Sequence, residues 1–202
     1  MTLSKAERVA LGVAAIVLLL QAAGIGAELE LRRALLAEQP WRVLTGHLVH
    51  LSWAHVAVNA AALVIVARLF AQDLDAPRQA AIMLLSAVAI GLGLAYAFPA
   101  IAWYRGLSGV IHALFFAGAT VWLATEPTFE WRRIWLPGAL LLGGWIKVLM
   151  EQPHDGALPH ADWLGAAVVP QAHLIGAACG SAIGLLLALA DRRREQQRAE
   201  QQ

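Results

Sequence analysis

The stretch YRGLSGVIHALFFAGATVWLA, residues 104–124, joins a glycine-flanked serine to an apolar run long enough for a membrane span. Ser108 stands at the start of this run, and Gly106 and Gly109 beside it allow a sharp turn and a close backbone approach. A second apolar run begins at Pro170 and carries one histidine, His173, near its start. A hydroxyl and an imidazole that enter a bilayer from one side are the first candidates for a functional site.

The composition of the chain indicates a polytopic membrane protein. Of its 202 residues, 59% are hydrophobic and 14% are charged, and the mean hydropathy is +0.62, whereas a soluble domain is about half apolar and a quarter charged. The net charge of +1, with basic residues scattered over the loops, predicts no nucleic-acid partner. The one cysteine, Cys179, excludes an internal disulfide and a CxxC motif.

Six apolar stretches approach the roughly 20 residues that a membrane-spanning helix needs. The connections between them leave no room for a separate soluble domain, so we expect a single all-α membrane domain over residues 1–202. The expected helices cover residues 9–27, 53–70, 80–101, 107–124, 134–150 and 170–190.

The distribution of basic residues sets the orientation, because cytoplasmic loops collect Lys and Arg. With the amino terminus inside, ten of the 15 basic residues fall on the inner side and five on the outer side. Both termini are therefore expected in the cytoplasm. The first stretch has a second interpretation as a cleaved signal peptide, since small residues at 24–27 precede Glu28. Its apolar run of about 19 residues exceeds the usual 7–15 of a signal core and favours a retained helix.

Polar residues gather in the first turns of the second and fourth expected helices. Ser52 suits the N-cap of the second helix, which places His55 in its first turn and Asn59 one turn below on the same face. Ser108 opens the fourth helix, with His112 one turn below it. Such side chains are costly in a span and usually face the bundle interior or a water-filled cavity.

The sixth expected helix continues this pattern. Pro170 suits its first position, so His173 lies in its first turn, at the same depth below the outer surface. Gly176, Gly180 and Gly184 recur every four residues behind it, and small residues let two membrane helices approach closely. Close approach of the fourth and sixth helices is what a Ser108–His173 bond requires.

The chemistry of these groups suggests nucleophilic catalysis. A serine hydroxyl is a weak nucleophile until a base takes its proton, and histidine is the usual base near neutral pH. We therefore assign Ser108 as the nucleophile and His173 as the general base. Unpaired backbone N–H groups at a helix start, including that of Ser108, would stabilise an oxyanion. The side chains of His55 and Asn59 would add further donors.

Taken together, these motifs resemble the rhomboid family of intramembrane serine proteases. Each motif alone is weak, but their order and common depth cover nearly the whole chain. The matching features are Gly106-x-Ser108-Gly109, His55-x-x-x-Asn59, the pair Trp41-Arg42 with His50 after it, and Ala172-His173 followed by Gly176 and Gly180.

The resemblance implies a six-helix bundle and a Ser108–His173 dyad without an acidic third member, and no Asp or Glu stands near His173 in the sequence. It also implies that His55 and Asn59 help to hold the oxyanion, and that no metal or cofactor takes part. The implied partners are the lipid bilayer and membrane-anchored protein substrates, which would enter between the second and fifth helices. Gly106, Gly109, His112 and His50 would support the site.

The sequence Tyr104-x-Gly106-Leu-Ser108-Gly109 and the compact form look more specifically like the rhombosortase branch. That branch is thought to process carboxy-terminal GlyGly-CTERM sorting tails on proteins bound for the bacterial surface. The resemblance thus implies a bacterial inner membrane protein with its site facing the periplasm. His112 departs from many rhomboids, which have a tyrosine there that packs on the catalytic histidine; an imidazole would stack in the same way or hold water or a proton.

Other interpretations remain open for these residues. A non-proteolytic rhomboid-like protein would bind membrane clients without cutting them, although such relatives typically lack the serine or the histidine. A metal or haem protein would use histidines such as His50, His55, His112 and His173 as ligands, but the chain has no HExxH motif. Lys147 would serve a Ser–Lys dyad, although snorkelling to the outer interface is favoured.

Overall fold

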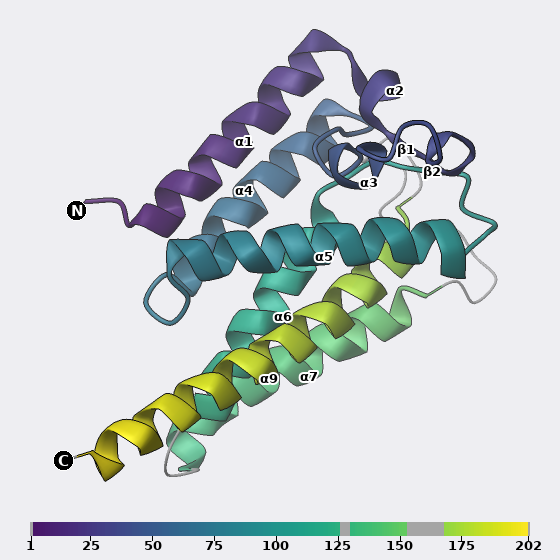
Figure 1. The fold of residues 1–202 in the computed structure, drawn as a ribbon. Helices are drawn as coiled ribbons and strands as arrows, with labels where there is room; N and C mark the ends of the chain where they lie inside the picture. Colours follow the sequence, from purple (N-terminus) through teal and green to yellow (C-terminus); the bar gives the residue numbers. More distant parts are fainter. Residues whose placement is uncertain (1, 126–129, 153–167, 202) are drawn as a thin grey trace.

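The computed structural model describes residues 2–125, 130–152 and 168–201 (Figure 1). Helices make up most of this part. The elements follow along the chain as α1 (Lys5–Ala23), α2 (Gly26–Leu29), β1 (Leu31–Arg32), the 3-10 helix η1 (Arg33–Leu35), α3 (Arg42–Thr45), α4 (Trp53–Leu69), α5 (Ala76–Ala97), β2 (Trp103–Tyr104), α6 (Ser108–Thr125), α7 (Trp131–Met150) and α9 (Pro170–Glu200).

Five helices of the described part, α1, α5, α6, α7 and α9, are long and apolar enough to cross a membrane. The sixth apolar helix, α4, has 17 residues and at 1.5 Å per residue rises about 26 Å, a little less than the roughly 30 Å hydrocarbon core. It packs against α1 and α6. The expected all-α, polytopic membrane fold is confirmed.

Both ends of the chain lie on the same side of the bundle in Figure 1, and α2, α3 and the short strands lie on the opposite side. Helices α4, α6 and α9 all begin on that opposite side. Their first turns, which carry the polar residues singled out above, are therefore at one end of the molecule.

Helix α6 is central and packs against α9, α5, α7 and α4. Most of its apolar side chains are buried, including Leu114 and Phe116, which are fully inaccessible. By contrast, α7 has few buried positions among its described residues. The nucleophile candidate Ser108 thus begins the best-packed helix, whereas α7 lies at the edge of the bundle.

The segment between α1 and α4 is ordered by a two-stranded antiparallel pairing of β1 with β2, in which Leu31 faces Tyr104. The buried carboxylate of Glu30 forms an ion pair with Arg105 at 2.6 Å. The guanidinium of Arg42 donates to the Glu30 carbonyl at 2.7 Å. These contacts fix the loop before Ser108 to the loop before α4, an addition to the expected all-helical architecture.

Helix α1 is displaced from the expected range 9–27. It begins at Lys5 because Ser4 and Glu7 form a capping box, with the Glu7 N–H donating to the Ser4 hydroxyl at 3.1 Å. It ends at Gly24, which has a left-handed φ of +70°. The capping box lies before the apolar run and Gly24 lies within the expected range. A hydropathy window registers neither signal, so it misplaces both ends of the helix.

Helices α5, α7 and α9 also differ from the expected ranges. Helix α5 begins at Ala76 rather than residue 80, because Asp75 accepts from the Arg78 N–H at 3.0 Å as an N-cap, and it ends at Ala97 rather than 101. Helix α7 begins three residues early, at Trp131. Helix α9 continues past residue 190 into the charged tail, where Asp191 pairs with Arg78 at 2.7 Å.

Candidate active site

Ser108 and His173 are 65 residues apart in the sequence and in direct contact in the structure. The Nε2 atom of His173 lies 2.9 Å from the Ser108 hydroxyl oxygen. Ser108 is the first residue of α6, and His173 is in the first turn of α9, where it is 5% exposed. A hydroxyl and an imidazole nitrogen in this arrangement have the geometry of a nucleophile and its general base.

The contact depends on how closely α6 and α9 approach. A Cβ atom at Gly176 would collide with the carbonyl oxygen of Gly109, and one at Gly180 would collide with that of Ala113. Gly184 repeats this relationship one turn further on, against Ala117. The predicted role of the four-residue glycine repeat in close helix approach is confirmed.

The turn before Ser108 is held from several sides. Gly106 has a φ of +136°, a conformation that residues with a side chain rarely adopt. Its N–H donates to the Gly46 carbonyl at 3.1 Å, and its carbonyl accepts from the hydroxyl of the buried Tyr104 at 2.5 Å. Gly109 leaves no room for a side chain because the Ala172 carbonyl lies against it. The turn therefore presents Ser108 in a fixed position.

His55 and Asn59 lie beside this turn on the first two turns of α4. Ser52 caps the helix as expected, accepting from the His55 N–H at 3.1 Å. The ring of His55 packs on Gly106, where a Cβ atom would be 3.2 Å from its Nε2. The amide nitrogen of Asn59 donates to the His55 carbonyl at 3.0 Å. One Asn59 N–H is thus used within the helix and the second is left for another acceptor.

His50 and His47 are also buried, His50 against the ring of His55 and His47 against the ring of Tyr104. The rings of His50 and His55 meet edge to face, with centroids 5.0 Å apart. Burial, with a smaller contribution from the nearby His55, lowers the pKa of His50 to about 3. Burial also lowers the pKa of His47 to about 4, although its ring donates to the Ala87 carbonyl at 2.9 Å. Both rings are therefore neutral near pH 7 and support the site by packing.

His112 lies directly against the candidate base. Its ring stacks on that of His173, with centroids 4.2 Å apart and planes 15° apart. Its Nδ1 lies 2.8 Å from the Ser108 carbonyl oxygen, which can only accept, so Nδ1 carries the proton. Its Nε2 is then free to accept from the Lys147 ammonium, 3.3 Å away.

Two charged residues at the end of α7 lie beside the candidate base. The sequence interpretation considered Lys147 but not its contacts here, and it missed Glu151. The Glu151 carboxylate lies 2.9 Å from His173 Nδ1 and 2.7 Å from the Lys147 ammonium. An acidic side chain that is distant in sequence thus lies beside His173, which the expectation of a dyad did not foresee, and the Lys147 ammonium contacts both Glu151 and His112. The available signal was the i,i+4 spacing of Lys147 and Glu151 at the outer end of a span.

Part of this cluster has the residue types of a metal site. Among the described residues, one group has ligand atoms close enough to share an ion, and it consists of His112, Glu151 and His173. His50 and His55 do not belong to it. The Lys147 ammonium already contacts both Glu151 and His112, so the cluster holds a cation of its own. This arrangement fits a proton-transfer network better than a metal centre.

The structure thus brings Ser108, His173 and His112 into mutual contact and places His55 against Gly106. Residues 37–190 match the Rhomboid domain family, a region that includes every one of these residues. No curated protein matches the chain in sequence.

Proposed function

The chain belongs to the rhomboid family of intramembrane serine proteases, and on that premise we propose that it cleaves membrane-anchored proteins with Ser108 as nucleophile and His173 as base. The observation that carries the proposal is the 2.9 Å contact between the Ser108 hydroxyl and His173 Nε2. This contact joins the first turn of α6 to the first turn of α9. Both turns are at one end of the bundle, where water from that side would reach them.

The proposed reaction proceeds through an acyl-enzyme. His173 Nε2 takes the hydroxyl proton of Ser108 while the oxygen attacks the scissile carbonyl carbon. The resulting tetrahedral intermediate collapses, the C–N bond breaks, and the leaving amine takes the proton from His173. Water then attacks the ester, giving its proton to His173, and the Ser108 oxygen recovers that proton as the acid product leaves.

Developing charge on the carbonyl oxygen requires preorganised donors. The first N–H groups of α6, beginning with Ser108, precede the bond from the Ile111 N–H to the Leu107 carbonyl, so they have no intrahelical acceptor and lie at the positive end of the helix dipole. The ring of His55 against Gly106 and the second N–H of Asn59 are the side-chain donors that we propose for the same oxygen.

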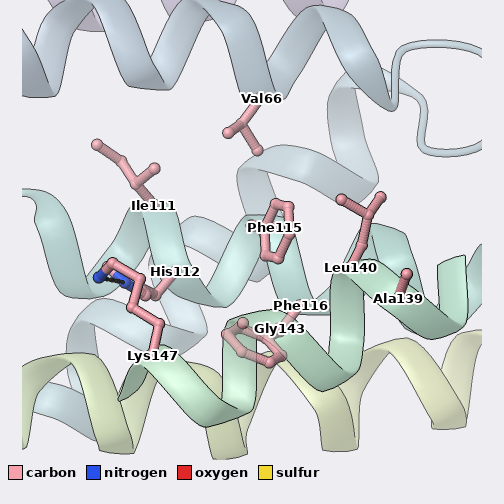
Figure 2. Close-up of a pocket in the computed structure, with 10 residues that line it drawn as sticks. Val66, Ile111, His112, Phe115, Phe116, Ala139, Leu140, Gly143 and Lys147 are labelled. Carbon is pink, nitrogen blue, oxygen red and sulfur yellow. Dashed lines mark hydrogen bonds between the residues drawn. The ribbon is translucent and has the colours of Figure 1, made fainter. Parts of the chain in front are cut away.

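We propose that the substrate enters through an apolar cavity of about 430 Å³ between α4, α6 and α7 (Figure 2). Val66 of α4, Phe115 of α6 and Leu140 of α7 are among the residues that line it. His112 and Lys147 lie at one end of it. The cavity therefore leads from bilayer-facing helices to residues that touch the site, the path that a membrane segment would take between the second and fifth spans.

We propose more specifically that the protein is a rhombosortase that removes carboxy-terminal GlyGly-CTERM tails from its substrates. The Tyr104-x-Gly106-Leu-Ser108 sequence supports it, and the hydroxyl of Tyr104 has a defined task there because it fixes the Gly106 carbonyl. Glycine at the cut would favour local unwinding of the substrate helix, since glycine has low helix propensity. An unwound backbone exposes the scissile carbonyl to Ser108.

We further propose that the protein lies in a bacterial inner membrane with the site facing the periplasm. The basic-residue count supports this orientation, because the end of the bundle that carries the termini also carries most Lys and Arg residues. The site lies at the opposite end.

The test is cleavage, in reconstituted membranes, of a reporter protein that ends in a GlyGly-CTERM tail. Ser108→Ala and His173→Ala are each expected to lower cleavage by at least about 10³-fold. Ser181→Ala, a serine deeper in α9, is the matched control and is expected to cleave as the wild type does. Wild-type rates in both site variants would contradict the protease assignment.

A further inference from the structure

Glu151 follows the last residue of α7 and contacts the far side of the candidate base. One carboxylate oxygen lies 2.9 Å from His173 Nδ1, while His173 Nε2 faces Ser108 at 2.9 Å. The Glu151 side chain is 19% exposed and that of His173 is 7% exposed. The three groups therefore form a continuous line from carboxylate through imidazole to hydroxyl, mostly shielded from water.

The carboxylate determines which nitrogen of His173 carries the proton. An ionised carboxylate can only accept hydrogen bonds, so Nδ1 must be protonated to make this contact. Nε2 then presents its lone pair to the Ser108 hydroxyl, as a general base must. The other tautomer would leave the carboxylate oxygen that faces His173 without a donor from the ring. It would also direct an N–H toward the Ser108 hydroxyl, so Nε2 could not take the hydroxyl proton.

We propose that Glu151 is a positioning residue that converts the Ser108–His173 pair into a Ser–His–Glu triad, by fixing the His173 tautomer and stabilising the imidazolium formed during attack. This inference rests on the proposed protease function. It adds to that function a group that acts through His173 and does not touch the substrate.

Lys147 holds Glu151 in place. Its ammonium donates to the second carboxylate oxygen at 2.7 Å and to His112 Nε2 at 3.3 Å. His112 in turn donates to the Ser108 carbonyl at 2.8 Å. The titratable groups around Glu151 in the described part of the chain are thus Lys147, His173 and His112, one from each of the helices that meet there.

Glu151 remains ionised in this setting. Burial raises the pKa of its carboxyl group, but hydrogen bonds and charge from His173 and Lys147 act more strongly in the opposite direction and hold it at about 2. A carboxylate is therefore available to His173 at any pH at which a periplasmic enzyme works.

The experiment compares kcat and KM for cleavage of the membrane reporter by wild type, Glu151→Gln and Glu151→Asp. Gln keeps the shape but removes the charge, so kcat is expected to fall on the order of 10²-fold with KM nearly unchanged. Asp restores a carboxylate and is expected to recover part of kcat. Glu130→Gln, at the exposed opposite end of α7, is the matched control.

Two further measurements keep the inference testable if Glu151→Gln folds poorly. Lys147→Gln, which changes a half-exposed side chain, is expected to lower kcat about 2- to 5-fold. Added formate is expected to raise kcat of Glu151→Ala and to leave Ser108→Ala inactive. Wild-type kcat in Glu151→Gln, together with an inactive Ser108→Ala, would overturn the triad alone. An active Ser108→Ala would instead overturn the protease function beneath it.

Discussion

The imidazole of His112 lies flat on that of His173, 4.2 Å away between centroids. This stack covers one face of the His173 ring and leaves its two ring nitrogens to Ser108 and Glu151. An aromatic ring one turn after Ser108 thus restricts the orientation of His173. The stack is a direct consequence of the four-residue spacing from Ser108, which puts His112 on the same face of α6.

The first prediction concerns this stack. Aromatic pairs contribute about 0.5–1.5 kcal/mol beyond their buried area, so His112→Ala is expected to lower kcat about 2- to 10-fold by loosening His173. His112→Phe keeps the ring and is expected to retain more activity than Ala. Steady-state cleavage of the membrane reporter measures both, and equal rates for Phe and Ala would exclude a stacking role.

The second prediction concerns the contact between α6 and α9. A methyl group at Gly180 would meet the Ala113 carbonyl, so Gly180→Ala is expected to destabilise the fold by about 1–3 kcal/mol. Gly138 on α7 has open space where its Cβ would be. Gly138→Ala should therefore be neutral or stabilising by up to about 1 kcal/mol. Thermal unfolding in detergent compares them, and a Gly180→Ala protein as stable as Gly138→Ala would contradict the close approach.

The third prediction tests the cavity of Figure 2 as the substrate path. Gly143 lines it and has open space for a side chain. Gly143→Leu is therefore expected to raise KM for a membrane-embedded reporter without lowering the melting temperature. Gly138→Leu places the same side chain on the same helix outside the cavity and serves as control. If the two variants have equal KM values, the substrate does not use this cavity.

The fourth prediction concerns pH and the Glu151 carboxylate. Its pKa of about 2 lies below the ordinary value of 4.5, so the unfolded chain binds this proton more readily than the folded one. The carboxylate therefore stabilises the fold above pH 4.5, and this contribution is lost as the pH falls toward 2. We expect the melting temperature of wild type to exceed that of Glu151→Gln by more at pH 6 than at pH 2.5. A difference independent of pH would contradict the assigned interaction.

Hydropathy and charge located all six apolar helices, because a bilayer imposes a length and a composition on each of them. The helix ends expected from hydropathy were less accurate. The caps of α1 and α5, at Ser4 and Asp75, lie before the apolar runs and act through local hydrogen bonds that hydropathy does not register. The short pairing of β1 with β2 joins residues about 70 positions apart and has no periodic signature in two residues.

The candidate site, too, could be predicted from the sequence only in part. Ser108, His173, His55 and Asn59 could be selected from the sequence because each stands in the first turns of a span, where polar side chains are costly. Glu151 could not be assigned to His173, because its contact depends on how the end of α7 meets the start of α9 in three dimensions.

The central claim is that Ser108 is a nucleophile activated by His173. The most direct measurement is mass spectrometry of the protein after treatment with a fluorophosphonate, which forms a covalent adduct with an activated serine. The adduct is expected on Ser108 of the wild type, absent from Ser108→Ala, and formed at least about 10²-fold more slowly in His173→Ala. An adduct on another residue, or equal rates in wild type and His173→Ala, would contradict the claim.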